Sequence, residues 1–195
     1  MGRGSYALAR VAVIVRAPAG WLWWPGVLAA GIGALVPGLT GRRIGVLAGA
    51  ALFLVAAVVV FAVRRKRYRE LARAASRAGK SVFLQDRAVT VRARRRALRW
   101  WLLLAFLAAV GSSFAVPAAG GMLLAGLGAG LWAKALWLGR WERANDALLW
   151  VRTERVSRGR PAGKAVDAYQ TTGIVAGDAG PGGARRQRTM APTAR

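Results

Sequence analysis

The chain has 195 residues, 55% of them hydrophobic, and carries 31 lysines and arginines against 7 acids, for a net charge of +24. The hydrophobic fraction lies above the roughly 45–50% of an ordinary soluble domain, so the apolar and basic residues must be segregated along the chain. Cysteine and histidine are absent, which excludes disulfides, Cys/His metal sites, cysteine nucleophiles and histidine general bases.

The N-terminal segment, residues 1–20, is predicted to be cytoplasmic because it contains Arg3, Arg10 and Arg16. Its apolar run, which ends at Arg16, has five residues, whereas a secretory signal needs roughly 7–15. We therefore expect residues 5–16 to lie as a short helix in the membrane interface.

Residues 21–63 are predicted to form a first transmembrane hairpin. Two uncharged blocks, 21–39 and 44–63, each have about the 20 residues that a helix rising 1.5 Å per residue needs to cross a hydrocarbon core of about 30 Å. The four residues between them, 40–43, are too few for anything but a tight turn.

Residues 64–99 form the predicted basic cytoplasmic loop, with fourteen basic residues and only Glu70 and Asp86 as acids. The arginines gather where the chain leaves the membrane and where it enters again, which is the layer of anionic lipid headgroups. The residues predicted to contact lipid or another polyanion are Arg64, Arg65, Lys66, Arg67, Arg69, Arg92, Arg94, Arg95, Arg96 and Arg99.

Within this loop, Gly79-Lys80-Ser81 matches the end of a phosphate-binding loop. The first glycine of that motif would be residue 74, which is alanine, and no buried strand precedes it. We predict instead a helix that continues the second span and ends near Gly79, a usual helix-stop residue.

Residues 100–139 contain one charged residue, Lys134, and are predicted to form a second transmembrane hairpin. Forty residues of helix measure about 60 Å, twice the core thickness, so two spans with a turn at residues 117–121 account for the whole block. Lys134 lies near the aqueous end of its span, where its side chain is expected to snorkel to the headgroups.

Beyond the last span, residues 140–156 are predicted to continue as an amphipathic cytoplasmic helix. Trp137, Trp141, Ala144, Leu148 and Val151 recur at helical spacing. Residues 157–195 are rich in glycine, proline and arginine with few large apolar side chains, so they are predicted to be a disordered basic tail.

These elements define an all-α integral membrane protein with four transmembrane helices in two hairpins, cytoplasmic helical extensions and a disordered C-terminal tail. Of the basic residues, 28 lie in the N-terminal segment, the central loop and the region after 139, against two in the first hairpin turn. The positive-inside rule therefore predicts that both termini are cytoplasmic. The abundance of alanine, glycine and arginine indicates a bacterial source, and hence the bacterial cytoplasmic (inner) membrane.

Two residue classes are predicted to position the helices. Tryptophans near the cytoplasmic ends of the spans favour the headgroup layer, and the predicted interface anchors are Trp21, Trp23, Trp24, Trp100, Trp101, Trp137 and Trp141. Small residues four apart allow helices to approach closely, within the chain or in a homo-oligomer, and these pairs are Gly45/Gly49 and Gly126/Gly130.

The sequence contains no carboxylate pair, serine-centred elbow or metal-ligand cluster, so we expect no catalytic residue, metal or cofactor. Three interaction functions stay open. The first is membrane anchoring with binding of anionic lipid or a partner protein. The second is non-specific binding of DNA, because each phosphate neutralised by arginine releases counterions. The third is a pore or transport subunit of the holin kind.

In span layout and basic loops, though in no motif, the chain resembles the small multi-span spread proteins of actinobacterial conjugative plasmids. The resemblance implies an accessory membrane protein of DNA transfer. It assigns no role to any single residue.

Overall fold

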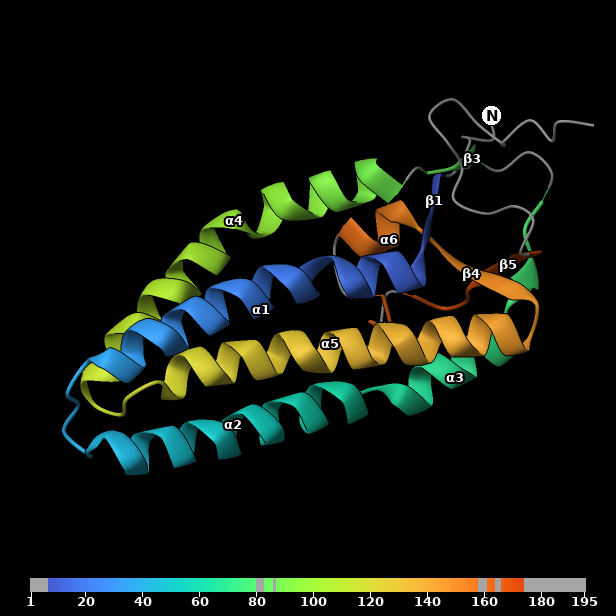
Figure 1. Cartoon of the computed structure of the whole chain (residues 1–195). Coiled ribbons are helices and arrows are strands. Elements are labelled where there is room, and N and C mark those ends of the chain that lie inside the picture. Colours follow the sequence, from blue (N-terminus) through green and yellow to red (C-terminus); the bar gives the residue numbers. More distant parts are fainter. Residues whose placement is uncertain (1–6, 80–82, 86, 158–160, 164–165, 174–195) are drawn as a thin grey trace, which may run out of the picture.

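The computed structural model of the chain describes residues 7–79, 83–85, 87–157, 161–163 and 166–173. The protein is mostly helical and elongated, with a small sheet at one end of a bundle (Figure 1). Four helices are long and apolar enough to cross a membrane: α1 (Val11–Leu35), α2 (Arg42–Ala62), α4 (Arg87–Gly111) and α5 (Ala119–Ala144).

The order of the helices across the bundle differs from the two predicted hairpins. α5 lies between α1 and α2 and makes the most extensive contacts in the bundle, and α4 packs on the other side of α1 (Figure 1). Helices that follow each other in the sequence are therefore not the main packing partners. The two hairpins predicted from the sequence are not what holds this bundle together.

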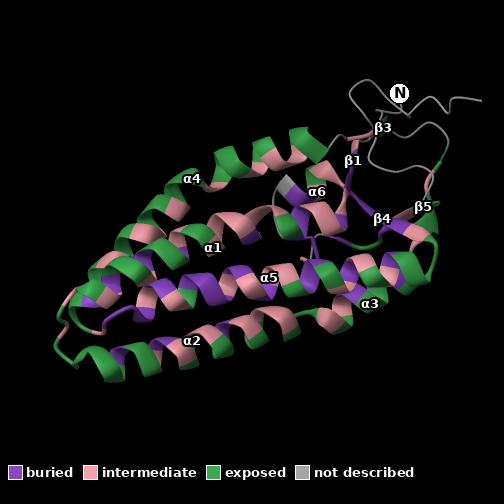
Figure 2. Ribbon diagram, in the orientation of Figure 1, coloured by how far each residue is buried: buried purple, intermediate pink, exposed green. Residues whose placement is uncertain are grey.

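Buried residues are more frequent along α5 than along α2 or α4 (Figure 2), and glycines on two faces of α5 explain its central position. Toward α1, a Cβ atom on Gly128 would lie 2.7 Å from the Trp23 amide nitrogen. Toward α2, a Cβ atom on Gly130 would lie 2.6 Å from the Ala57 carbonyl oxygen, and one on Gly126 would overlap the backbone of Phe53. Only hydrogen fits at these positions, so the backbones of three helices approach closely.

The remaining glycines of the predicted pairs lie at the same interface. A Cβ atom on Gly45 of α2 would lie 2.6 Å from Cδ of Pro117, and one on Gly49 would lie 3.2 Å from Cγ of Met122. Pro117 directly precedes α5, so both glycine pairs face the contact between α2 and α5. Gly121, expected in a turn, is helical and packs against α1 instead.

A five-stranded sheet at one end of the bundle corrects the all-α expectation. Its order is β2-β5-β4-β1-β3, with β4 antiparallel to β1 and β5, and with β1–β3 and β2–β5 parallel. The strands are β1 (Ala7–Arg10), β2 (Ser76–Arg77), β3 (Phe83–Leu84), β4 (Ala147–Arg152) and β5 (Gln170–Gly173). The sheet thus joins the N-terminal, central and C-terminal segments.

The predicted helix over residues 140–156 is wrong beyond Ala144. α5 ends at Ala144, Asp146 has a positive φ of 48°, and β4 follows, with a short helix α6 (Thr153–Ser157) after it. Leu148 to Val151 are all buried, as in a strand covered on both faces. A short continuous apolar run does not distinguish a buried strand from a helix, and sheet pairing decides it here.

Three further expectations are corrected by the sheet. Residues 7–10 form a strand rather than part of an interfacial helix, and α1 begins at Val11 and continues through Arg16. Helix α3 (Arg65–Arg73) ends before β2, well short of Gly79. Residues 166–173 belong to the sheet and its core rather than to a disordered tail. Lys80, Ser81 and residues 174–195 lie outside the described residues.

The main core lies where the sheet meets the helices. Val11 and Ile14 of α1, Leu71 of α3 and Leu138 of α5 pack with Leu149 of β4 in one buried cluster. Next to it, the hydroxyl of Tyr169 donates to the carbonyl oxygen of Pro161 at 2.9 Å. Burial raises the pKa of Tyr169 above its ordinary range, so this donor stays protonated.

Replacement of Gly126 by alanine tests whether the close approach of α5 to α2 holds the bundle together. We expect Gly126→Ala to lower the unfolding free energy in detergent by about 1–3 kcal/mol, because the new Cβ would overlap the Phe53 backbone. The matched control is Gly31→Ala on α1, where nothing lies within 4 Å of a Cβ atom. Equal melting temperatures for the two variants would contradict this account of the packing.

Candidate functional site

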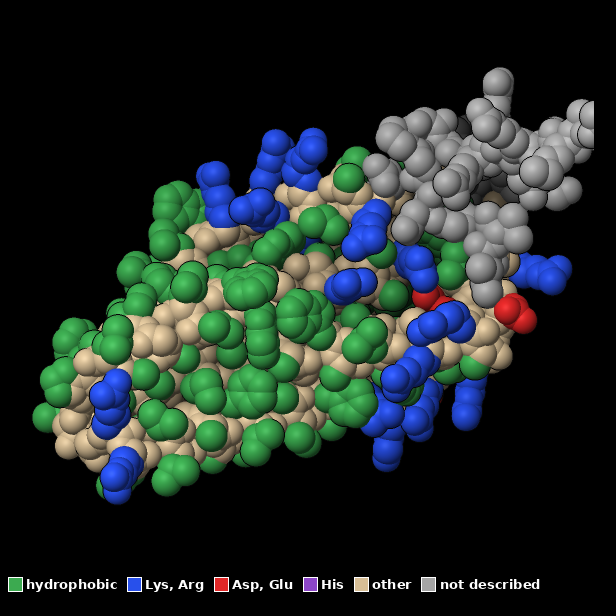
Figure 3. All heavy atoms as spheres, in the orientation of Figure 1, with side chains coloured by type: hydrophobic (Ala, Val, Ile, Leu, Met, Phe, Trp, Pro, Cys, Tyr) green, Lys and Arg blue, Asp and Glu red, His purple; other side chains and the backbone are tan. Residues whose placement is uncertain are grey.

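Basic side chains gather on the half of the molecule that carries the sheet and extend along α4 toward the middle of the bundle, whereas hydrophobic side chains cover most of the remaining surface in this view (Figure 3). Smaller numbers of basic side chains lie at the opposite end, where α2 begins with Arg42 and Arg43. The sheet end is therefore the candidate site for polyanions.

Two of the predicted lipid-contacting arginines bind the protein itself. Arg64 has a positive φ of 62° and separates α2 from α3, and its Nη1 donates to the Ala162 carbonyl oxygen at 3.3 Å. Nη2 of Arg67 donates to the carbonyl oxygens of Gly163 and Val166 at 3.2 and 3.4 Å. These side chains fix the C-terminal segment against α3, a role that the charge pattern did not reveal.

Other cations of α3 surround one tryptophan. The guanidinium of Arg65 lies 4.4 Å from the ring centroid of Phe61 and 5.0 Å from that of Trp137. The guanidinium of Arg69 lies 5.6 Å from the Trp137 ring, and Lys66 is exposed. Cation–π contacts of this kind hold the arginines beside an indole while their outer edges face solvent.

The second basic cluster lies on the N-terminal half of α4. Arg92, Arg95, Arg96 and Arg99 are exposed, Arg94 is partly buried, and Arg99 lies over the Trp100 ring at 5.4 Å. α4 and α3 flank opposite sides of the bundle (Figure 1), so the structure does not bring the two predicted arginine clusters together. It offers two separate basic surfaces at one end.

The predicted interface tryptophans divide into two groups. Trp24, Trp100 and Trp101 are 64%, 63% and 72% exposed. Trp21, Trp23, Trp137 and Trp141 are partly buried. The Trp23 ring lies 5.5 Å from that of Trp132, so this pair contributes to packing between α1 and α5.

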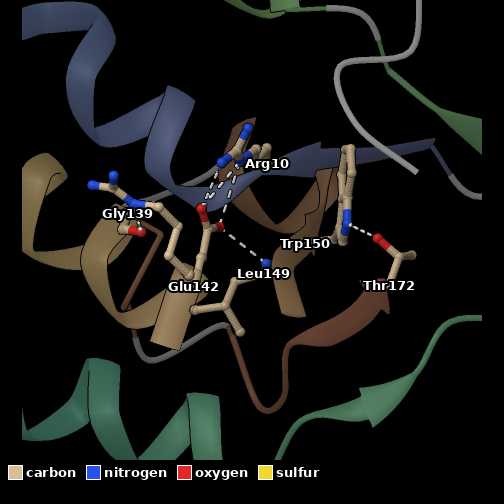
Figure 4. A network of polar contacts seen from close by, with 7 residues as sticks. Arg10, Gly139, Glu142, Leu149, Trp150 and Thr172 are labelled. Carbon is tan, nitrogen blue, oxygen red and sulfur yellow. Dashed lines mark hydrogen bonds and ion pairs between the residues drawn. The ribbon is translucent and has the colours of Figure 1, made fainter. Parts of the chain in front are cut away.

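A buried ion pair joins the sheet to the helices (Figure 4). Nη2 and Nε of Arg10 lie 2.7 and 3.2 Å from Oε2 of Glu142, and Oε1 of Glu142 accepts a hydrogen bond of 3.1 Å from the Leu149 amide. Glu142 is 1% exposed. No motif in the sequence distinguishes Glu142 from the other acids, and only the fold reveals its burial.

The ammonium group of Lys134 also finds a hydrogen-bond acceptor inside the protein. Its Nζ donates to the Val63 carbonyl oxygen at 2.9 Å and lies 5.8 Å from the Tyr68 ring centroid. The break between α2 and α3 at Arg64 leaves the end of α2 near this ammonium. The predicted snorkelling to the headgroups is wrong, because the side chain is buried against the end of α2.

Among the residues that the structure describes, no group of three or more His, Cys, Asp or Glu side chains could hold a metal ion. Comparisons with models of protein families, with curated proteins and with solved structures give no match. What the site offers is cationic hydrogen-bond donors beside exposed aromatic and apolar side chains.

Removing the buried carboxylate charge tests the importance of the ion pair. We expect Glu142→Gln to lower the unfolding free energy by about 2–3 kcal/mol, because Arg10 loses its charged partner in a largely buried place. The matched control is Asp167→Asn, which neutralises an exposed ion pair with Arg155 and should change stability by less than about 1 kcal/mol. Equal losses in thermal unfolding would contradict a special role for Glu142.

Proposed function

We propose that this chain is a multi-pass protein of the bacterial cytoplasmic membrane, without catalytic chemistry, that acts by anchoring in the bilayer and binding anionic lipid at its basic end. The proposal also includes binding of a partner protein at the same basic end, as an alternative to lipid. The observation that carries it is the concentration of exposed arginines on the half of the molecule that carries the sheet, beside a bundle whose sides are apolar (Figure 3).

The apolar sides support the anchoring. Large hydrophobic side chains on α1, α2 and α4 are exposed over the length of the bundle, including Leu28, Leu47, Val58 and Leu104. Soluble monomers rarely expose contiguous apolar patches of more than a few hundred Å². The 21 residues of α2 measure about 31 Å, which matches the hydrocarbon core.

The two basic surfaces support the binding of lipid. On α4 the exposed Arg95, Arg96 and Arg99 directly precede Trp100 and Trp101, so cations and indoles follow one another along one helix. Indoles favour the headgroup layer, and each basic residue near an anionic surface contributes about 1 kcal/mol to membrane binding. Arginines held at that layer reach lipid phosphates without any movement of the helices.

DNA is the main rival ligand, because exposed arginines bind any polyanion. The resemblance to spread proteins favours non-specific DNA binding, and a holin-like pore is the other alternative. The packing of α5 by glycine and alanine supports a closed bundle more than a pore. An arginine surface next to tryptophans at the headgroup layer favours lipid over DNA.

The orientation can be tested by labelling, since the sequence has no native cysteine. We expect a cysteine at Thr40, in the α1–α2 connection, to react with an impermeant maleimide in intact cells. A cysteine at Ser76, in β2, should react only after permeabilisation, because the positive-inside rule places the sheet end in the cytoplasm. Both positions are exposed and carry small polar side chains. The reverse labelling pattern would overturn the proposed topology.

Charge reversal on α4 separates lipid from DNA. We expect replacement of Arg94, Arg95 and Arg96 by glutamate to impair insertion or orientation and to weaken binding to anionic bilayers. Duplex DNA should associate weakly with the wild type in anionic bilayers, because lipid competes for the same cations. The measurement is a DNA titration at two salt concentrations in neutral and anionic bilayers. Strong, salt-sensitive DNA binding that persists on anionic lipid, and is lost in a correctly oriented triple variant, would favour the DNA-transfer alternative.

A further inference from the structure

A groove with a volume of about 670 Å³ opens between α1, α4 and α5. Its size falls within the roughly 300–1,000 Å³ of typical small-molecule sites. Arginines from β1, α1, α4 and α5 line it, and these are Arg10, Arg16, Arg87 and Arg143. Its apolar lining includes Trp21, Trp132 and Leu136. Among the described residues, its lining includes no arginine of α3 and none of Arg92 to Arg99.

The lining changes from basic to apolar along the helix axes. α1 runs away from the sheet, from Arg10 and Arg16 to Trp21, and α5 runs toward it, from Trp132 to Arg143. The contact between the Trp23 and Trp132 rings sets this alignment of the two helices. On α5 the lining extends over eleven residues, from Trp132 to Arg143, or about 16 Å. The cations therefore lie toward the sheet and the indoles toward the middle of the bundle.

The basic end of the groove carries a net positive charge. Its lining, within the part of the chain that the structure describes, includes no Asp or Glu. Glu142 lies behind Arg10 and neutralises one of the four guanidinium groups (Figure 4). Arg16 and Arg143 are exposed, and Nε of Arg143 is held by the Gly139 carbonyl oxygen at 3.3 Å. An anion that enters here meets charged hydrogen-bond donors from two helices.

We propose that this groove binds one anionic phospholipid, with its phosphate at Arg16 and Arg143 and the upper part of an acyl chain against Trp21, Trp132 and Leu136. A soluble anion would use the arginines and leave the apolar end empty, whereas a phospholipid complements both ends. The inference rests on the proposed function and deepens it. It assigns a discrete site, distinct from general attraction of lipid to the basic surfaces.

Native mass spectrometry of the protein in nanodiscs tests the site. One nanodisc preparation contains phosphatidylcholine alone, and the other an equimolar mixture with phosphatidylglycerol. We expect one phosphatidylglycerol molecule to stay bound after release from the mixed nanodiscs. The double variant Arg16→Gln/Arg143→Gln should bind it roughly thirtyfold more weakly, since two cations near the phosphate are lost. Ala17→Phe narrows the groove without changing its charge, so this variant should also lose the retained lipid. It replaces the double variant in the test if the double variant does not fold.

The comparison variant Arg92→Gln/Arg96→Gln removes the same charge from the exposed face of α4. It should weaken general, salt-sensitive attraction to anionic bilayers and still retain the one lipid. Equal loss of the retained lipid in both double variants would contradict lipid binding in the groove, and so would retention of the lipid in Ala17→Phe. Neither result would contradict the proposed function. Displacement by soluble glycerol phosphate would also overturn it in favour of a simple anion site. Absence of any preference for phosphatidylglycerol in the wild type would overturn the proposed function itself.

Discussion

A buried carboxylate on α5 joins the helical bundle to its sheet. Glu142 binds the Arg10 guanidinium, at the junction of β1 and α1, and the backbone amide of Leu149 in β4. The N-terminal segment and β4, which are far apart in the sequence, therefore converge on the two oxygen atoms of one α5 side chain. A buried charge of this kind is tolerated only when its partners are held in place, so the sheet and the bundle stabilise each other through this contact. Its burial also leaves the basic end of the molecule with one acid fewer at the surface.

The second constraint is the close packing around α5. Glycines on two of its faces admit α1 and α2 to backbone contact, and this buries α5 while the outer faces of α1, α2 and α4 stay apolar and exposed. In hydrocarbon, such packing rather than water exclusion holds helices together. The same arrangement leaves α4 in contact mainly with α1, and beside its N-terminal half lies the arginine-lined groove.

The basic residues of this end have different roles although the sequence presents them as one group. Arg64 and Arg67 bind carbonyl groups of the C-terminal segment, Lys134 binds the end of α2, and Arg10 binds Glu142. The exposed arginines of α4 face outward and support the proposed contact with lipid. Net charge therefore overstates how much of the cationic surface is available to a ligand.

The sequence by itself determined the four long apolar helices and the uneven distribution of arginine, because length and hydropathy are local properties. It also indicated the two glycine pairs, since small residues four apart lie on one face of a helix. It could not reveal the sheet, because each strand is short and strands that pair are far apart in the sequence, as β1 and β4 are, and β2 and β5. The run from Leu148 to Val151 shows why, since its spacing fits a helix or a strand until β1 and β5 pair with it. Only the tertiary structure decided the central position of α5, the burial of Glu142 and Lys134, and the groove, because each depends on side chains that meet from separate segments.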